Sequence, residues 1–340
     1  MSSLLAFTCL TVSLASPPTP PTAEDRPHVV LIAGDEEYRS EETLPMLAAI
    51  LQRDHGCETT VLFSLDDDGR VDPERLDHLP GTEALDDADL LVLFTRFRAL
   101  PDDQLEPILR YAASGRPMVG LRTATHAFRY PNPHPRAADL NADWPRRVFG
   151  QCWITHHGHF DEGAAPLTRV MPREPSPQDD PAIADHPVLR GVGPFEAFSW
   201  LYHVEGGGDA LPGSATRLLD GEAIKSGHTE RFDRFPRRNP VAWTIERDEP
   251  GLPSRVFFTT LGHPYDFRAV DMRRLVVQGM LWAMNREATI PAGGVSCDPP
   301  PGWRPTNAGF GGQRRGRTPS EAITEPDRAR SEAAETRTSD

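Results

Sequence analysis

The stretch HVVLIAGDEEYRSEETLPMLAAILQRDHGCETTVLFS, residues 28–64, carries the clearest fold signal in this chain. It opens with an apolar run that ends in Gly-Asp, as the buried strands of parallel sheets do. Apolar residues then recur at nearly helical spacing over residues 40–56, with Ser40 as the expected N-cap and Gly56 as the expected C-terminal stop. A second apolar strand completes the stretch. This order of strand, helix and strand predicts an α/β sheet.

The same alternation continues along the chain. Apolar strands are expected at residues 88–97 and 117–121, with a helix between them at 102–115. Further expected elements are strands at 150–160, 198–204, 215–223, 240–246 and 255–262 and a closing helix at 268–285. Two proline-rich loops, 131–146 and 161–187, interrupt the pattern. Apolar strands separated by amphipathic helices predict an α/β fold with a doubly wound, mostly parallel sheet covered by helices on both faces.

The two ends of the chain differ from this body. Residues 1–16 contain an apolar run of signal-peptide length, too short to span a bilayer, and a proline-rich linker follows at 17–26. We expect export to the periplasm or beyond, or a cytoplasmic location if this segment, which has no Lys or Arg before its apolar run, is not a leader. Residues 27–290 are expected to form the α/β domain and 291–314 a surface extension. The tail 315–340 has few large apolar side chains and is expected to be disordered.

Composition excludes several classes of function. The formal net charge of −14 argues against nucleic-acid and anionic-membrane partners, which need a basic surface. Lys225 is the only lysine, so Schiff-base chemistry is disfavoured. There is no P-loop and no G-x-G-x-x-G after a strand, so no nucleotide site is expected. Outside the N-terminal segment, Cys57, Cys152 and Cys297 do not form a disulfide pattern.

Two groups of polar residues follow expected strands. In GDEEYRSEE, residues 34–42, Glu37 or Glu41 is a candidate general base or sugar-hydroxyl ligand; the alternative is that these acids only complement the helix dipole. The turn after residues 117–121 has neither serine nor cysteine, which disfavours acyl-enzyme chemistry. Arg122 is there a candidate ligand for an anionic or hydroxyl-rich molecule. His126 is a candidate acid, base or metal ligand, or else a structural histidine.

Two further groups contain histidine. In THHGHF, His157 and His159 would share one face of a strand, a spacing found in metal sites. A divalent metal such as Zn²⁺ would need a third ligand, for which His126, Glu205 and His263 are candidates; the alternative is exposed or hydrogen-bonded histidines. His263 follows another expected strand, at the same sheet edge as His126 or in an incidental turn.

Six blocks follow one another over about residues 27–290: HVVLIAGDEEYRSEETLPMLAAIL, ADLLVLFTRFRALPDDQL, GRPMVGLRTATHAF, HPVLRGV, NPVAWT and RVFFTTLGHPYDF. In this order they resemble the trehalose-utilisation (ThuA-like) family, in the exported branch seen in planctomycete-like bacteria. The resemblance implies a three-layer fold similar to class I glutamine amidotransferases. It places the turn at 117–126 at the nucleophile elbow, where this chain has Arg122 and Thr123 in place of a cysteine. Glutaminase activity is therefore not expected.

The resemblance also implies a crevice and a substrate class. The crevice would be lined by Arg122, His126, His157, Glu222 and His263. The family is linked to sugar metabolism, so a small carbohydrate or oxidised (keto) sugar is the expected substrate, acted on by general acid–base chemistry in a hydrolase, lyase or isomerase. The alternative is a carbohydrate-binding or scaffold protein without catalysis. A homo-oligomer is a further candidate partner state.

Overall fold

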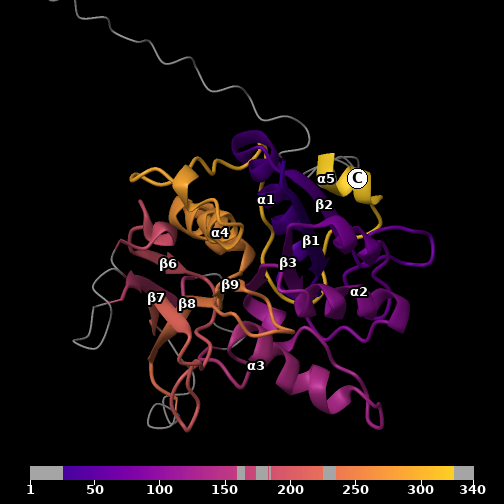
Figure 1. The fold of residues 1–340 in the computed structure, drawn as a ribbon. Coiled ribbons are helices and arrows are strands. Elements are labelled where there is room, and N and C mark those ends of the chain that lie inside the picture. Colours follow the sequence, from indigo (N-terminus) through magenta and orange to yellow (C-terminus); the bar gives the residue numbers. More distant parts are fainter. Residues whose placement is uncertain (1–25, 159–164, 174–182, 184, 225–234, 325–340) are drawn as a thin grey trace, which may run out of the picture.

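A computed structural model describes residues 26–158, 165–173, 183, 185–224 and 235–324 (Figure 1). The expected signal peptide and nearly all of the expected linker therefore lie outside the described residues. The strands are β1 (His28–Gly34), β2 (Glu58–Phe63), β3 (Leu90–Thr95), β4 (Met118–Leu121), β5 (Thr168–Pro172), β6 (Phe195–Ala197), β7 (Ala215–Ala223), β8 (Arg238–Glu246) and β9 (Arg255–Thr259). The α-helices are α1 (Ser40–His55), α2 (Asp102–Ala113), α3 (Trp144–Phe149), α4 (Val270–Ala283) and α5 (Pro319–Thr324).

In the described residues these strands form one mixed sheet in the order β2-β1-β3-β4-β9-β8-β7-β5-β6. The pairs from β2 to β9 are parallel, and the pairs from β9 to β6 are antiparallel. The expectation of a mostly parallel sheet thus describes only one half. The connection between β8 and β9, residues 247–254, shows why. It is shorter than the dozen or so residues that a parallel crossover needs, so the chain turns back antiparallel.

Helices cover both faces of the sheet, with α1 and α4 on one side and α2 and α3 on the other (Figure 1). In β1, Val29 and Leu31 pack into the core under α1 and α4, whereas Val30 and Ile32 pack into the core under α2 and α3. A strand buried on both faces reads as a continuous apolar run, which explains the clear signal at residues 28–35. The α/β fold with helices on both faces is confirmed.

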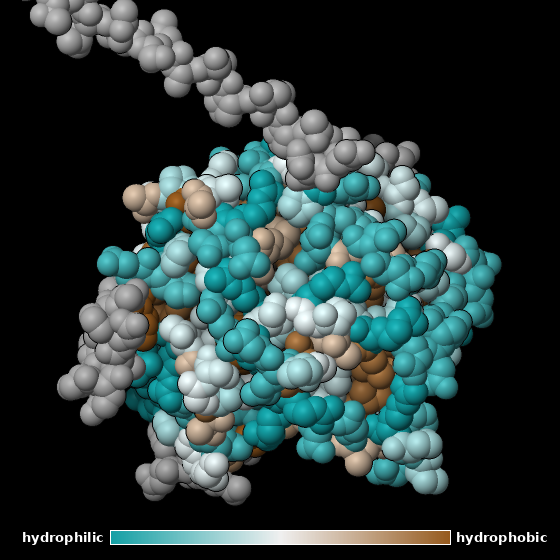
Figure 2. Space-filling model, viewed as in Figure 1, coloured by the Kyte–Doolittle hydropathy of each residue, from teal (hydrophilic) through white to brown (hydrophobic). Residues whose placement is uncertain are grey.

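The surface seen in Figure 2 is mostly hydrophilic, with small hydrophobic areas between polar ones. Among the described helices, none combines the length and apolar character needed to cross a bilayer. The described cysteines Cys57, Cys152 and Cys297 are all free thiols.

Two expected strands are absent as strands. Residues 150–158 and 198–204 are irregular and meet through a single bridge between His156 and Tyr202. Their backbones bond to each other, from His157 N to the Leu201 carbonyl and from His203 N to the Thr155 carbonyl, and Val204 N donates to the Asn239 side chain on β8. Aromatic and β-branched residues fit any half-buried extended surface, so their presence does not require a ladder. The expected loops also hold structure: α3 lies partly in 131–146, and β5 lies in 161–187.

The C-terminal segment is more ordered than its composition indicates. The expectation of disorder from residue 315 is wrong for 315–324, which include α5 with Ala322 buried; residues 325–340 lie outside the described part. Trp303 is buried, and its Nε1 donates to the Glu42 carbonyl. Phe310, the other large aromatic residue of this segment, is 57% exposed. Hydrogen bonds hold much of this segment, such as the one from Gly309 N to the Glu37 carbonyl. The low content of apolar residues, on which the expectation of disorder was based, does not predict such bonds.

Candidate functional site

The candidate site lies where four neighbouring strands end. Strands β1, β3, β4 and β9 are adjacent and parallel, so their carboxyl ends meet at one edge of the sheet, the usual place for ligands in such folds. The residues that follow these ends are Glu37, Arg96, Arg122 and His263. The sheet therefore brings together four of the groups considered below.

Asp35 connects the loop after β1 to the turn after β4. Its Oδ1 accepts hydrogen bonds from the backbone N–H groups of Glu37, at 2.7 Å, and Tyr38, at 2.5 Å. Its Oδ2 accepts from the Thr123 hydroxyl at 2.5 Å. The expected N-cap Ser40 is instead the first helical residue of α1, and its Oγ accepts from Asp35 N. The loop after β1 is thereby tied to the turn after β4.

Glu37 is a buried acid with a basic neighbour. It is 5% exposed, and the Arg96 Nε lies 3.0 Å from its Oε2. Arg96 also pairs with Glu36, which Arg98 contacts from the other side. Burial raises the pKa of Glu37, an effect that the charge of Arg96 opposes only in part. Glu37 therefore holds a proton to higher pH than an exposed glutamate does.

Arg122 begins the turn after β4 and is completely buried. Its φ of 41° is a left-handed conformation that costs energy for a residue with a Cβ. Nη1 donates to the carbonyls of Thr260, at 2.8 Å, and Trp200, at 3.3 Å. Nε is buried without a hydrogen-bond partner among the described residues. The Arg122 side chain is therefore a positive charge inside the protein and does not lie on its surface.

Two tyrosine rings enclose this guanidinium. Its Cζ lies 4.1 Å from the centre of the Tyr38 ring and 4.5 Å from that of Tyr202, and Nη2 donates to the Tyr38 hydroxyl at 2.9 Å. Burial lowers the pKa of Arg122, but Tyr202, Tyr38 and Asp266 outweigh it, so that the pKa is raised. The charge of Arg122 also acts on Glu37, whose pKa it lowers. The buried cation and the buried acid thus interact electrostatically at this edge of the sheet.

His126 lies on the Tyr202 side of Arg122. Its ring centre is 5.1 Å from that of Phe97, 5.2 Å from that of Trp153 and 6.3 Å from that of Tyr202. Burial, together with the charges of Arg96 and Arg122, holds the pKa of His126 well below its usual value. The imidazole is therefore neutral at physiological pH.

His263 lies on the other side, next to Tyr38, with ring centres 6.3 Å apart. It caps the 3₁₀ helix Pro264–Arg268: its Nδ1 accepts from Tyr265 N at 3.0 Å, and Asp266 completes the capping box. Burial, with the nearby charge of Arg122, lowers its pKa to about 3. The structure thus brings His126 and His263 to one edge but places the Tyr202–Arg122–Tyr38 stack between them.

Only one member of the expected metal pair, His157, lies within the described residues. His157 is buried, and its Nε2 lies 3.2 Å from the Pro236 carbonyl oxygen; His159 lies outside the described part of the chain. His156 instead stacks on Trp200 and influences the pKa of His126. Successive side chains do alternate here, but the residue facing the site is His156. No group of three His, Cys, Asp or Glu side chains with metal-site geometry occurs within the described ranges.

Glu222 is displaced from the other expected site residues. It lies on β7, opposite Arg169 on β5 and Arg238 on β8, so that β8 separates its strand from β9. Glu41 is completely buried in the first turn of α1, and burial together with Glu42 raises its pKa to about 8. Its Oε1 accepts a hydrogen bond from Arg314 N, so Glu41 binds the C-terminal segment.

Sequence reasoning missed several members of the site. They are Asp35, Tyr38, Arg96, His156 and Tyr202. Asp35 and Arg96 directly follow apolar strands, and that position was a usable signal. Tyr38, His156 and Tyr202 lie in loops whose path only the folded chain defines, so their sequence context carries no comparable signal.

Comparison with known proteins shows only distant likeness. No protein-family model and no curated protein matches the chain. Among solved structures, ThuA-like proteins from Bacteroides uniformis and Parabacteroides merdae are similar, at 12% and 16% identity and TM-scores of 0.48 and 0.46. The alignments cover 78% and 76% of this chain and 95% and 90% of theirs. An exo-β-1,4-mannosidase from an Opitutaceae bacterium aligns at 12% identity and a TM-score of 0.34, over 78% of this chain and 36% of its own. With all these TM-scores below 0.5, the family stays an expectation from the motifs.

Proposed function

We propose that this protein is a ThuA-like enzyme that acts on a carbohydrate, with an oxidised (keto) sugar as substrate class, by general acid–base chemistry without a cysteine nucleophile. The observation that supports this proposal is the placement of Glu37, a buried acid with a raised pKa, beside the buried cation Arg122 at the carboxyl edge of the sheet. Perturbed acids and bases of this kind concentrate at functional sites.

The chemistry of a keto sugar needs few groups. A carbonyl acidifies the neighbouring C–H bond, so a base that takes this proton and a positive charge near the carbonyl oxygen are sufficient. Glu37 is the proposed base, because its raised pKa makes its carboxylate a stronger base than an exposed one. Arg96, whose Nε lies 3.0 Å from the Glu37 carboxylate, and Arg122, whose charge acts on it, supply the positive charge. The proton then returns from the same carboxyl group.

The turn after β4 supports chemistry without a covalent intermediate. Arg122 is buried, and the Thr123 hydroxyl donates to Asp35, so neither residue presents a free nucleophile. Neutral His126 lies among the rings of Phe97 and Trp153. Aromatic rings offer apolar surface of the kind that ligand pockets use, with the imidazole as a polar contact among them.

Exchange of deuterium into the C–H next to the carbonyl of a keto-disaccharide, followed by NMR, tests this proposal. The assay includes wild type with and without added Zn²⁺. Glu37→Gln should lower the exchange rate at least about 100-fold, as loss of a general base does. Glu58→Gln, at the exposed start of β2, is the matched control and should leave the rate unchanged. No exchange by wild type, or equal rates in Glu37→Gln and wild type, would overturn the proposal.

The aromatic surroundings of His126 also favour a second candidate, a carbohydrate-binding protein without catalysis. Saturable binding of a keto sugar by wild type, with no exchange and no product in any arm, assigns this function instead. Hydrolysis of glutamine, measured as released ammonia, is expected to be absent under both readings because no cysteine occupies the turn.

A further inference from the structure

Three arginine side chains line an open cavity beside the candidate site. The cavity has a volume of about 560 Å³, in the range of small-ligand sites. Arg268, Arg273 and Arg304 line it together with aromatic and proline residues, which are Tyr265, Trp303, Pro299 and Pro305. No carboxylate is among these lining residues. In a chain of net charge −14, this cavity is a local concentration of positive charge.

In the described part of the chain, none of the three arginines forms an ion pair. Arg273 is 7% exposed and donates only to backbone carbonyls, those of Cys297, Phe267 and Arg268, at 2.8, 2.6 and 2.9 Å. A buried charge without an opposite charge costs energy, and an anion in the cavity would reduce that cost.

Tyr265 connects this cavity with the candidate site. The Arg268 Cζ lies 3.4 Å from the centre of the Tyr265 ring, and the His263 ring centre lies 5.2 Å from the same ring. Tyr265 thus lies between the cavity and the candidate site, with Arg268 stacked on its ring and His263 nearby. A ligand in the cavity would lie next to the edge of the sheet that carries His263.

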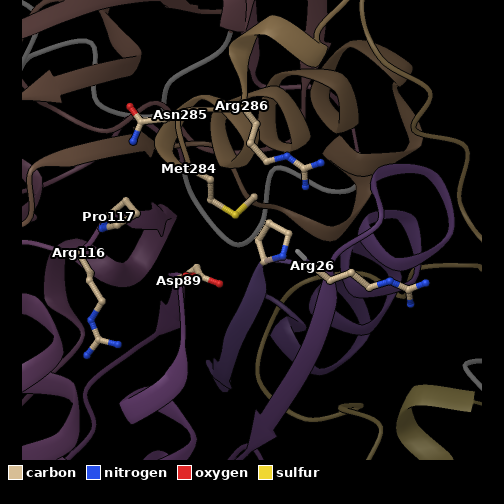
Figure 3. A pocket seen from close by; sticks show the side chains of 8 residues that line it. Arg26, Asp89, Arg116, Pro117, Met284, Asn285 and Arg286 are labelled. Atoms are coloured by element: carbon tan, nitrogen blue, oxygen red, sulfur yellow. The ribbon is translucent and has the colours of Figure 1, made fainter. Parts of the chain in front are cut away.

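A second cavity provides a contrast. It has a volume of about 530 Å³ and is lined by Arg26, Arg116 and Arg286, but also by the carboxylate of Asp89 (Figure 3). In Figure 3 the Arg116 side chain points away from Arg26 and Arg286. Its Nη1 is used by three backbone carbonyls, those of Leu85, Asp86 and Ala88. The second cavity therefore differs from the first in having a carboxylate, that of Asp89, among its lining residues.

We propose that Arg268, Arg273 and Arg304 bind the oxyanion group, a carboxylate or a phosphate, of a small ligand in the first cavity. Guanidinium groups suit both anions because their paired N–H groups match two oxygen atoms. If the proposed function also holds, the ligand is an acidic or phosphorylated sugar whose neutral part lies towards His263. That extension rests on the proposed function, whereas anion binding does not.

Isothermal titration calorimetry with inorganic phosphate, at constant ionic strength set by NaCl, tests the site. Wild type should bind saturably, and Arg304→Gln should weaken binding at least about tenfold, because the loss of one charged hydrogen bond has an effect of this size. Arg26→Gln, in the second cavity, is the matched control and should bind as wild type does. Arg268→Gln, also at an exposed residue, gives an independent second variant if Arg304→Gln fails to fold.

Gluconate and glucose 6-phosphate distinguish the sources of the anion. Tighter binding of gluconate assigns a sugar carboxylate, and tighter binding of glucose 6-phosphate assigns a phosphate ester. The absence of saturable heat with all three probes overturns the proposal, as does an equal loss of affinity in Arg304→Gln and Arg26→Gln. Anion binding by a protein that fails the deuterium-exchange assay would reject the proposed function and leave this site standing.

Discussion

The Thr123 hydroxyl donates a 2.5 Å hydrogen bond to the carboxylate of Asp35, and this bond spans a strand. Asp35 follows β1 and Thr123 follows β4, and β3 lies between these two strands in the sheet. The bond therefore couples two loops that are 88 residues apart in sequence. It holds the loop with Glu37 against the turn with Arg122.

Removal of this hydroxyl should destabilise the fold. Thr123→Val keeps the shape of the side chain but leaves the buried Asp35 Oδ2 without its donor, which we expect to cost about 1–3 kcal/mol. Urea unfolding followed by circular dichroism measures this cost. Thr216→Val, on β7, is the control and should stay within about 0.5 kcal/mol of wild type. Equal stability of both variants would mean that the bond contributes nothing.

The carboxyl half of β4 leaves no space for a side chain at Gly120. A Cβ there would lie 2.6 Å from a Phe258 ring carbon and 2.7 Å from one of Phe149, closer than carbon atoms pack. Gly120→Ala should lower the free energy of unfolding by about 1–3 kcal/mol through overpacking. Gly213→Ala meets no atom within 4 Å and should be nearly neutral in the same urea titration. A neutral Gly120→Ala would show that the two rings move apart easily.

The two aromatic residues of the C-terminal segment should differ in their contribution to stability. Trp303 is 8% exposed and Phe310 is 57% exposed. Trp303→Ala should cost about 3–5 kcal/mol, the usual range for a buried tryptophan, whereas Phe310→Ala should cost less than about 1 kcal/mol. Thermal unfolding of the two variants beside wild type measures both. A larger loss in Phe310→Ala would contradict the packing described above.

Acid should destabilise the protein in part through His263. Its pKa falls from 6.5 to about 3 on folding, so between these values the unfolded state binds a proton that the native state does not. The free energy of unfolding therefore falls as the pH is lowered through this window, by up to about 1.4 kcal/mol per pH unit from this group. His263→Asn can still cap the 3₁₀ helix but does not titrate. Urea titrations at about pH 7 and pH 4.5 should show a smaller loss in the variant than in wild type, and an equal loss would contradict the assignment.

The sequence predicted local features well where one physical pattern dominates. The helix expected at 40–56 is α1, Ser40–His55, with Gly56 as its left-handed C-cap, and the strand expected at 215–223 is β7. Residues 102–115 and 117–121 correspond to α2 and β4 within two residues. In each case burial requires a pattern of apolar residues, periodic or continuous, that the sequence shows directly.

Elements and contacts that depend on distant partners were not predictable in this way. The irregular segments at 150–158 and 198–204 have strand-like composition, but their backbones bond to each other. The order found at 315–324 rests on hydrogen bonds such as the one from Val71 N to the Arg317 carbonyl, which no local sequence pattern predicts. Polar bonds of this kind have no periodicity, so composition alone predicted disorder.

By itself, the sequence determined that apolar strands alternate with helices and that polar residues follow the strands, because burial on both sheet faces requires continuous apolar runs. Only the tertiary structure decided that the second half of the sheet is antiparallel, that His156 and not His157 faces His126, and that Arg122 is a buried cation between Tyr38 and Tyr202. These outcomes depend on which loops cross the sheet edge. Loop paths are set by contacts between residues far apart in the chain, and spacing along the sequence does not encode them.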